Sequence, residues 1–332
     1  MEDSEIKSNA VVGRFAPSPT GRMHVGNVFT ALLSWLSVRS RGGEWVLRIE
    51  ELDRGRSRTE WAQWIEDDLQ WLGLVWDRGG IADTTSPGAP FCQSLRSDHY
   101  ERALGRLAAQ GLTYPCTCTR ADIMATQAPH ESDGRVVYQG TCRPKQGPPF
   151  QGSHPWRQGA ATRLWVPDSQ IVVVDANYGS TAVNLARHCG DFVLRRGDGA
   201  WAYQLAVVVD DAEMGVTEVV RGHDLLLSAA QQMYLCELLG YAAPRYMHVP
   251  LVCNNAGVRL SKRDSGLDLG ALRQRLTAPE IIGALAYMAG LTDTPAPVSA
   301  RELFGVFRPT PQMHAPTVSV ADILLYGHTV DL

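Results

Sequence analysis

Residues 11–27 read VVGRFAPSPTGRMHVGN, and this stretch decides the fold. The apolar run Val11–Phe15 predicts a short buried strand. The segment Ala16–Gly21 contains two prolines and a glycine, which interrupt regular structure and predict a turn. Apolar residues then recur at helical spacing, at Val25, Val28, Phe29, Leu32, Leu33 and Leu36. The stretch therefore predicts a strand, a turn and a helix in direct succession.

The order of elements that follows is typical of a parallel α/β sheet. Gly42-Gly43 ends the first helix, and residues 45–49 are a second strand candidate. Ser57 and Glu60 have the spacing of a capping box, which predicts the start of a second helix. The nearly continuous apolar run 203–209 ends in two aspartates, and it predicts a central strand whose carboxyl end faces a site.

The chain divides into two halves of one sheet domain with an insertion between them. Residues 113–170 are rich in Gly, Pro, Thr, Gln and Arg, which favours loops, and the α/β pattern returns near Asp191. A strand at Val219-Val220 and a helix over 228–239 follow. We expect a polar tail at 1–10, the first half of the catalytic domain at 11–108, the insertion at 109–190, the second half at 191–255, and a loop with a C-terminal helical region at 256–332.

Composition excludes several classes of protein. The chain has 332 residues, a formal net charge of −4 and 45% hydrophobic residues, which are values typical of a globular enzyme rather than a disordered or fibrous chain. No apolar run has the length of a membrane span, and the polar first ten residues are no secretory signal. We expect a cytoplasmic monomer without a membrane partner. The slight negative charge argues against indiscriminate nucleic-acid binding.

Two segments far apart in sequence are candidates for binding a nucleotide. In the turn before the first helix, backbone N–H groups and the positive helix end can hold an anion; His24 can donate to a phosphate, and Gly26 lets a flat ligand approach. Far downstream, a basic loop contains Arg259, Ser261 and Lys262. A lysine on such a loop can stabilise charge as pyrophosphate leaves. Each segment alone has an ordinary structural explanation, but the pair is a specific signal.

These segments resemble the signatures of the class I glutamyl-tRNA synthetases. Residues 13–27 look like the HIGH motif of that family, and residues 259–263 look like its KMSKS motif. Residues 47–53 and 220–224 resemble two further family motifs in the right order. The resemblance implies a Rossmann-like catalytic domain that converts glutamate and ATP into glutamyl-adenylate and pyrophosphate.

The resemblance also implies which residues form the site. His24 and Lys262 are implied as the catalytic pair. Arginines suit the two carboxylates of glutamate, a carboxylate suits its ammonium, and a tyrosine hydroxyl fixes its orientation. The implied glutamate-binding residues are Arg14, Phe15, Ala16, Pro17, Ser18, Glu50, Tyr203 and Arg221. The implied ATP-binding residues are His24, Gly26, Asn27, Ser261 and Lys262.

The match is closer to short paralogues of the family that modify tRNA(Asp). Residues 114–120 resemble their zinc segment, and residues 201–211 resemble their second-half strand. Only positions 263–332 follow Lys262, which we expect to be too few for the anticodon-binding region of a full synthetase. The paralogue match implies tRNA(Asp) bearing queuosine as partner, with the cyclopentenediol ring of that base as acceptor.

Seven cysteines without an export signal make a disulfide framework improbable and favour a metal site. Cys116, Cys118 and Cys142 lie close in sequence and supply three thiolates for a structural zinc ion. A closed tetrahedral site needs a fourth ligand. The resemblance implies Tyr138 for that position, whereas ligand chemistry alone favours His130.

Some features leave alternatives open. Arg135, Arg143, Arg157 and Arg163 suit either RNA phosphates or an exposed solubilising face. One rival function is a conventional or truncated synthetase that charges the tRNA 3′ end. A second is an RNA-binding regulator that has lost catalysis, and a third is a small-molecule ligase that adenylates a carboxylate.

Overall fold

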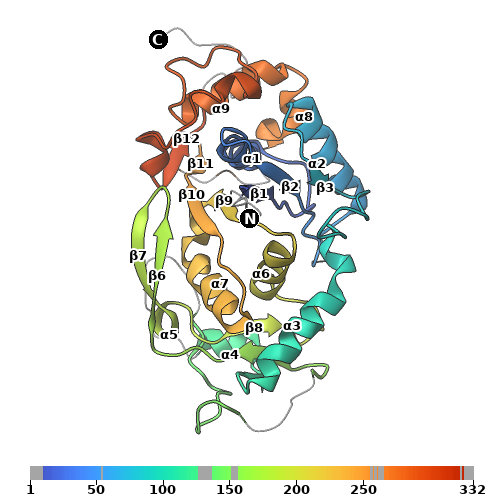
Figure 1. The fold of residues 1–332 in the computed structure, drawn as a ribbon, viewed down its shortest axis with the longest axis vertical. Helices are drawn as coiled ribbons and strands as arrows, with labels where there is room; N and C mark the ends of the chain where they lie inside the picture. Colours follow the sequence, from blue (N-terminus) through green and yellow to red (C-terminus); the bar gives the residue numbers. More distant parts are fainter. Residues whose placement is uncertain are drawn as a thin grey trace, which may run out of the picture.

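The computed structural model describes residues 10–53, 55–125, 137–150, 156–254, 257, 260, 265–321 and 324. At its centre is a seven-stranded sheet with the order β3-β2-β1-β9-β10-β6-β7 (Figure 1). Neighbouring strands are parallel except in the β6–β7 hairpin, which confirms the predicted parallel α/β class. The strands are β1 (Val12–Phe15), β2 (Glu44–Leu47), β3 (Arg78–Gly79), β6 (Gln170–Asp175), β7 (Gly179–Asn184), β9 (Glu218–Gly222) and β10 (Arg245–Val249).

Helices cover both faces of this sheet. Side chains alternate along a strand, so Trp45 and Leu47 of β2 enter one hydrophobic core and Val46 enters the other. The first core contains residues of α1 (Val25–Arg39), α2 (Thr59–Trp71), α8 (Leu269–Leu272) and α9 (Ala278–Met288). The second contains residues of α3 (Ser97–Ala109), α6 (Tyr203–Glu213) and α7 (Leu226–Leu239). The sheet is therefore doubly wound.

The strand order creates a switch point between β1 and β9. From β1 the chain proceeds to β2 on one side, whereas β9 and β10 lie on the other. In open α/β sheets, ligands bind at such a point, beyond the carboxyl ends of the strands. Phe15 and Gly222 are the last residues of these two strands. A ligand bound at this point would therefore contact the residues that follow Phe15 and Gly222.

The apolar run 203–209 is helical, which corrects the predicted strand. It forms most of α6, and Leu205 to Val209 are all buried in the second core. A short apolar run does not distinguish a buried strand from a helix that is covered on all sides. Here α3 and α7 pack beside α6, so a helix buries every one of these side chains. The two aspartates at its end consequently lie inside the domain.

The small separate sheet does not coincide with the predicted insertion, 109–190. A separate antiparallel sheet consists of β4 (Thr113–Cys116), β5 (Ala161–Leu164) and β8 (Phe192–Arg195), so the insertion's sheet includes residues beyond 190. In contrast, β6 and β7 lie within 109–190 but extend the main sheet through β10. The strands pair across long stretches of sequence, which local composition does not reveal. Two short helices, α4 (Arg120–Ala125) and α5 (Leu185–His188), complete this region.

One predicted helix boundary is confirmed, and another is wrong. Gly240 has φ 66° and ends α7 in the left-handed conformation, as predicted. The predicted capping box at Ser57 is wrong, because α2 begins after Arg58, and the buried Ser57 hydroxyl has no hydrogen bond within the described residues.

The C-terminal elements occupy one end of the long axis, and α4 and β8 lie toward the other (Figure 1). The strands β11 (Leu251–Cys253) and β12 (Thr317–Ser319) pair in parallel. The described residues contain no helix long and apolar enough to span a membrane. The short 3₁₀ helices are η1 (Gln93–Leu95), η2 (His223–Leu225), η3 (Ser265–Leu267), η4 (Ala300–Leu303) and η5 (Gln312–His314).

Candidate active site

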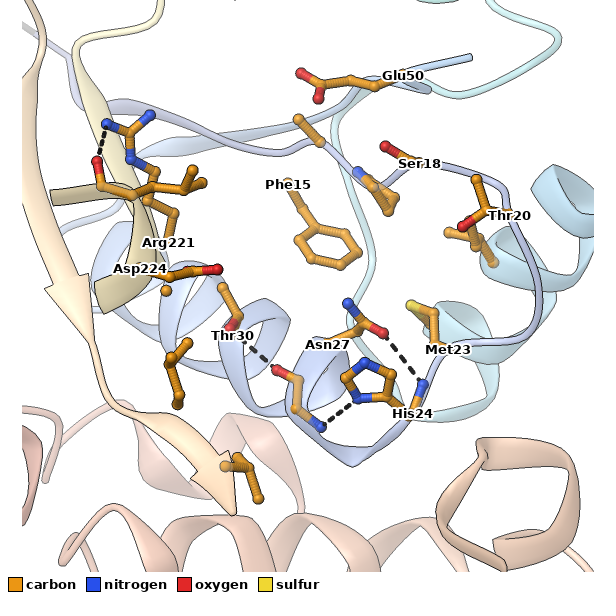
Figure 2. A pocket seen from close by; sticks show the side chains of 18 of the residues that line it. Phe15, Ser18, Thr20, Met23, His24, Asn27, Thr30, Glu50, Arg221 and Asp224 are labelled. Atoms are coloured by element: carbon orange, nitrogen blue, oxygen red, sulfur yellow. Dashed lines mark hydrogen bonds between the residues drawn. The ribbon is translucent and has the colours of Figure 1, made fainter. Parts of the chain in front are cut away.

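A cavity of about 500 Å³ opens at the switch point, and Figure 2 shows side chains that line it. Its walls come from the turn after β1, the start of α1, the end of β9 and the segment between β10 and β11. The structure brings many of the sequence-derived candidates to this one cavity. They are Arg14, Phe15, Ala16, Pro17, Ser18, His24, Gly26, Asn27, Glu50, Tyr203 and Arg221.

His24 is the N-cap of α1, at the positive end of the helix (Figure 2). Its Nδ1 accepts from the Gly26 N–H at 3.1 Å, and the Asn27 side chain accepts from the His24 N–H at 3.2 Å. The neutral ring therefore carries its proton on Nε2. A Cβ on Gly26 would lie 3.0 Å from His24 Cε1, so the glycine makes room for the imidazole. Gly26 also lines the cavity, where we expected it to let a ligand approach.

A buried charge network lies behind Arg14 and Glu50, two residues that line the cavity. The Asp211 carboxylate accepts from Arg48 Nη1 at 2.6 Å and contacts Arg14 Nε at 3.4 Å. Arg48 Nη2 also donates to Glu50 at 3.0 Å. Burial opposes ionisation of Asp211, but the two arginines outweigh it and lower the pKa of this carboxyl. Asp211 thus holds Arg14 and Arg48 in place, a role that the sequence analysis missed.

Glu50 is the polar group suited to an amino acid's ammonium, and Tyr203 adds a hydroxyl that can fix the orientation of the ligand. The Glu50 N–H donates to Pro17 O at 3.0 Å, which ties this carboxylate to the turn after β1. Burial raises the pKa of Glu50, while Arg48 and Arg14 oppose the shift. An ammonium ligand would stabilise the ionised form. Burial also raises the pKa of Tyr203, which keeps its phenol neutral and able to donate.

Arg221 presents its guanidinium to the cavity from the end of β9. The side chain is 4% exposed, and within the described residues it donates from Nε to His248, from Nη1 to Gln232 and from Nη2 to Leu225 O. A guanidinium has five N–H donors. These contacts leave one donor on each terminal nitrogen, the number that a carboxylate accepts in a paired contact.

The predicted basic-loop residues Arg259, Ser261 and Lys262 lie outside the described residues. Leu260, which lies within that loop, is described, as are the residues from Ser265 onward. Leu260 lines the same cavity as His24, and its N–H donates to Val252 O at 3.1 Å. After the loop, Asp268 forms a bridge with His24.

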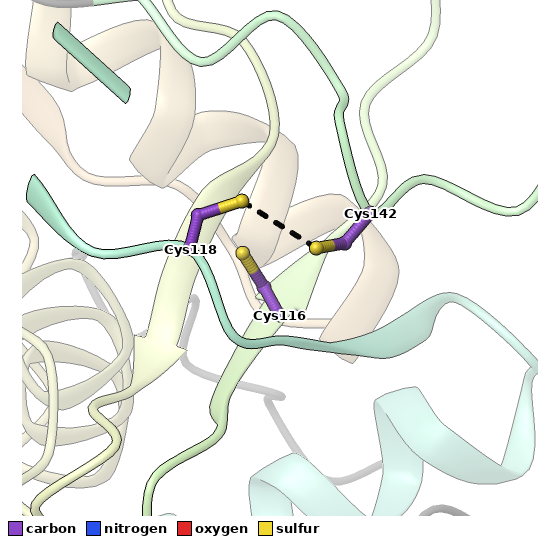
Figure 3. Close-up of side chains that lie close together, drawn as sticks. All are labelled: Cys116, Cys118 and Cys142. Carbon is purple, nitrogen blue, oxygen red and sulfur yellow. Dashed lines mark hydrogen bonds between the residues drawn. The ribbon is translucent and has the colours of Figure 1, made fainter. Parts of the chain in front are cut away.

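The three cysteines of the insertion gather at one point (Figure 3). The sulfurs of Cys116, Cys118 and Cys142 all lie within 4.8 Å of one another. The Cys118–Cys142 separation is 3.5 Å, close to the ~3.8 Å that Zn–S bonds of about 2.3 Å impose in a tetrahedron. Burial opposes ionisation of Cys142, but hydrogen bonds from Thr117 and the neighbouring groups outweigh it and lower the pKa of this thiol to about 7. The donor set fits zinc.

Tyr138 supplies a fourth donor atom beside the sulfurs. Its hydroxyl oxygen lies 3.5 Å from Cys116 Sγ and 3.9 Å from Cys118 Sγ, and it accepts from the Cys142 N–H at 2.6 Å. The alternative ligand, His130, lies outside the described residues. Burial raises the pKa of Tyr138. Nearby positive charge would favour its ionised form.

Two of the four arginines considered for RNA binding make contacts within the insertion. Arg143 pairs with Asp191 at 2.6 Å. Arg163 is buried, lies 3.7 Å from the centre of the Tyr138 ring and donates to Asp191 O at 2.7 Å. The Arg143 side chain is 34% exposed and Arg163 is buried, and both are held by Asp191 within the insertion. Arg157 is exposed, and Arg135 lies outside the described residues.

The fold and site together define a class I aminoacyl-tRNA synthetase catalytic domain. Residues 10–295 match the family model for tRNA synthetases class I (E and Q), catalytic domain. The structure of a glutamate tRNA ligase from Elizabethkingia meningosepticum, in complex with its amino acid, superimposes with a TM-score of 0.77 at 28% identity. The superposition covers 95% of this chain and 68% of that one.

Curated relatives narrow the assignment further. The glutamyl-Q tRNA(Asp) synthetase of Symbiobacterium thermophilum is 46% identical over 299 residues, which cover 89% of this chain and 91% of that protein. The protein of the same name from Nitratidesulfovibrio vulgaris is 42% identical over 314 residues, covering 94% and 96%. The chain belongs to the glutamyl-Q tRNA(Asp) synthetase family, and it is accordingly a ligase of the class I synthetase type for which glutamate, ATP and tRNA are the fitting partners.

Proposed function

We propose that the protein activates glutamate with ATP and transfers the glutamyl group to the queuosine base of tRNA(Asp). One observation carries the proposal. A single cavity contains Arg14 and Arg221 for carboxylates, Glu50 for an ammonium and the N-terminus of α1 for phosphates. Glutamate carries two carboxylates and one ammonium, so the charges of the cavity complement those of this amino acid.

Positioning and electrostatics carry the activation step. A carboxylate oxygen of glutamate attacks the α-phosphorus of ATP, and pyrophosphate leaves from the opposite side. His24 donates from Nε2 to the phosphates, and the turn at Gly26 and Asn27 presents the positive helix end. We assign Ser261 and Lys262 to the same phosphates, which Lys262 would stabilise as charge develops. No protein nucleophile is required.

In the transfer step, an acceptor hydroxyl attacks the glutamyl carbonyl, and AMP leaves. A second cavity, of about 510 Å³, is lined partly by residues of the insertion. Leu52 and Asp53 line it two and three residues after Glu50, and Trp201 lines it two residues before Tyr203. The lining includes Arg196, which pairs with Asp198 at 2.6 Å, and Trp156, whose ring lies 4.6 Å from the Arg195 guanidinium. Arginines and an aromatic ring are residue types that suit RNA. We assign the acceptor base to this cavity.

The acceptor assignment is tested by locating the transferred label. Radioactive glutamate, ATP and the enzyme are incubated with tRNA from cells that make queuosine and from cells that do not. We expect label only on the queuosine-containing tRNA, retained after trimming of the 3′ end and recovered in the anticodon-loop fragment. Label that needs no queuosine and disappears on 3′ trimming would instead establish charging of the terminal adenosine.

We propose that Cys116, Cys118, Tyr138 and Cys142 hold one structural zinc ion. The insertion's satellite core contains only four buried hydrophobic side chains among the described residues, so a metal crosslink would stabilise it. We expect one zinc per chain by elemental analysis. Cys142→Ser should lose the ion and lower the melting temperature, while Cys189→Ser, outside the cluster, should keep it. A purified protein without zinc, whose melting temperature does not change on chelation, would refute the site.

A further inference from the structure

A buried chain of hydrogen bonds lies behind Arg221, on the side away from the cavity. Asp175, at the end of β6, has its Oδ2 2.6 Å from His248 Nδ1. On the other edge of the imidazole, Nε2 lies 3.0 Å from Arg221 Nε. The side chains of Asp175 and His248 are both 0% exposed. These hydrogen bonds therefore join β6, β10 and β9, and Arg221 is the one member of the three that lines the cavity.

The contacts permit only one protonation state of His248. The Nε of arginine always carries a hydrogen and never accepts. His248 Nε2 must therefore accept from Arg221, and the ring proton must sit on Nδ1, from which it is donated to Asp175. A protonated ring would have no acceptor for Arg221. The observed geometry requires a neutral imidazole of one tautomer.

Asp175 is itself fixed by the backbone around it. Its Oδ1 accepts from the N–H groups of Asn177 and Tyr178, both at 2.9 Å, and its Oδ2 also accepts from the His248 N–H at 3.0 Å. Asn177 donates from its side chain to His248 O at 3.0 Å. Each of these contacts restricts rotation of the carboxylate or the strand. The imidazole is consequently held rigidly toward Arg221.

We propose that His248, oriented by Asp175, is a positioning residue that fixes the plane of the Arg221 guanidinium for a glutamate carboxylate. The donor on Nε is committed to His248, and Gln232 and Leu225 each take one terminal donor. A guanidinium held at three points presents its two remaining donors in a fixed direction. This inference rests on the proposed role of Arg221 in binding glutamate.

The arrangement makes glutamate binding sensitive to acid. The charged and titratable groups facing His248 are Asp175 from β6, Arg221 from β9, His223 from η2 and Tyr246 from its own strand. Burial lowers the pKa of His248, and the lowering by Arg221 and His223 adds to it, against the raising effect of Asp175. Protonation at low pH would convert Nε2 from an acceptor into a donor and set two cations against each other. Glutamate affinity should therefore fall as pH falls.

Two substitutions at His248 test the proposal in glutamate-dependent ATP–pyrophosphate exchange. His248→Phe removes the acceptor, and we expect the KM for glutamate to rise about 10- to 100-fold, since hydrogen bonds to charged groups contribute about 1.5–3 kcal/mol. The KM for ATP should stay unchanged. His248→Gln offers an amide oxygen to Arg221 and should recover part of the affinity. Because the amide does not ionise, its rise in KM toward low pH should be smaller than that of the wild type.

The comparison separates this role from a structural one. Glu50 titrates in every variant, so the difference between wild type and His248→Gln isolates the imidazole. His314→Gln, which changes an exposed histidine, serves as the matched control. A His248→Gln profile identical to wild type, or a loss of kcat without a change in the KM for glutamate, would overturn the proposal. If His248→Phe does not fold, the pH profile of His248→Gln decides alone.

An Arg221→Lys variant, measured in parallel, separates the proposed binding role of Arg221 from the proposed positioning role of His248. An unchanged KM for glutamate in Arg221→Lys would remove the proposed binding role of Arg221. A raised KM in Arg221→Lys together with a normal KM in both His248 variants would overturn only the positioning role of His248.

Discussion

Replacement of Arg221 by glutamine is expected to lower kcat/KM for glutamate by at least about 30-fold in ATP–pyrophosphate exchange. Removing one partner of a buried, hydrogen-bonded charge pair costs about 2–5 kcal/mol, much of it from the charge that is left unpaired. Here that charge would be a glutamate carboxylate in a cavity whose cations are buried. The loss should appear in the KM for glutamate, with the KM for ATP close to that of the wild type.

The matched control for this prediction is Arg187→Gln. Arg187 is also an arginine, but its side chain is 76% exposed and its nearest carboxylate, on Asp168, lies 3.9 Å away. Surface pairs of this kind contribute little. A KM for glutamate in Arg221→Gln within about threefold of the wild type (about 0.6 kcal/mol) would show that this arginine does not bind the substrate.

Replacement of Asp210 by leucine is expected to lower the free energy of unfolding by about 3–5 kcal/mol, because it leaves the buried donors of Arg96, Gln93 and Tyr100 without the carboxylate that they share. Asp210 is 0% exposed and accepts from Arg96 at 2.6 Å, from Gln93 at 2.7 Å and from the Tyr100 hydroxyl at 2.9 Å. Arg48 lies 3.8 Å away. Denaturant unfolding followed by circular dichroism measures the effect.

Two further variants make the Asp210 result interpretable. Asp210→Asn keeps hydrogen-bonding atoms in place and should lose less stability than Asp210→Leu. Asp168→Leu changes an aspartate that is 65% exposed, and we expect less than about 0.5 kcal/mol. Equal stability of Asp210→Leu and Asp168→Leu would mean that the buried charge network does not hold α6 in place.

The strand, turn and helix at the start of the site could be predicted because they depend on residues that are neighbours in the sequence. The prolines and glycine after Phe15 interrupt the strand, and the apolar spacing from Val25 onward is helical, so strand, turn and helix follow from neighbouring residues. The role of Arg14 and the location of Glu50 came instead from the family resemblance. Residue type and spacing alone would have left each of them as an ordinary surface or paired charge.

What the sequence did not reveal depends on contacts between distant elements. The run 203–209 is a helix because α3 and α7 surround it, and its two aspartates become partners of Arg48 and Arg96 rather than groups at a strand end. The pair of Asp175 and His248 joins residues 73 positions apart. No periodicity or short motif relates such residues before the strands are aligned in the sheet.

Glutamate-dependent ATP–pyrophosphate exchange, measured with zinc present and tRNA absent, tests most directly whether one cavity joins ATP to an acidic amino acid. We predict exchange that requires glutamate and that aspartate and glutamine support poorly, since the former is one methylene shorter and the latter lacks the second carboxylate. A folded, zinc-loaded enzyme that shows no exchange with glutamate would contradict the account and favour a protein that kept the fold for RNA binding alone.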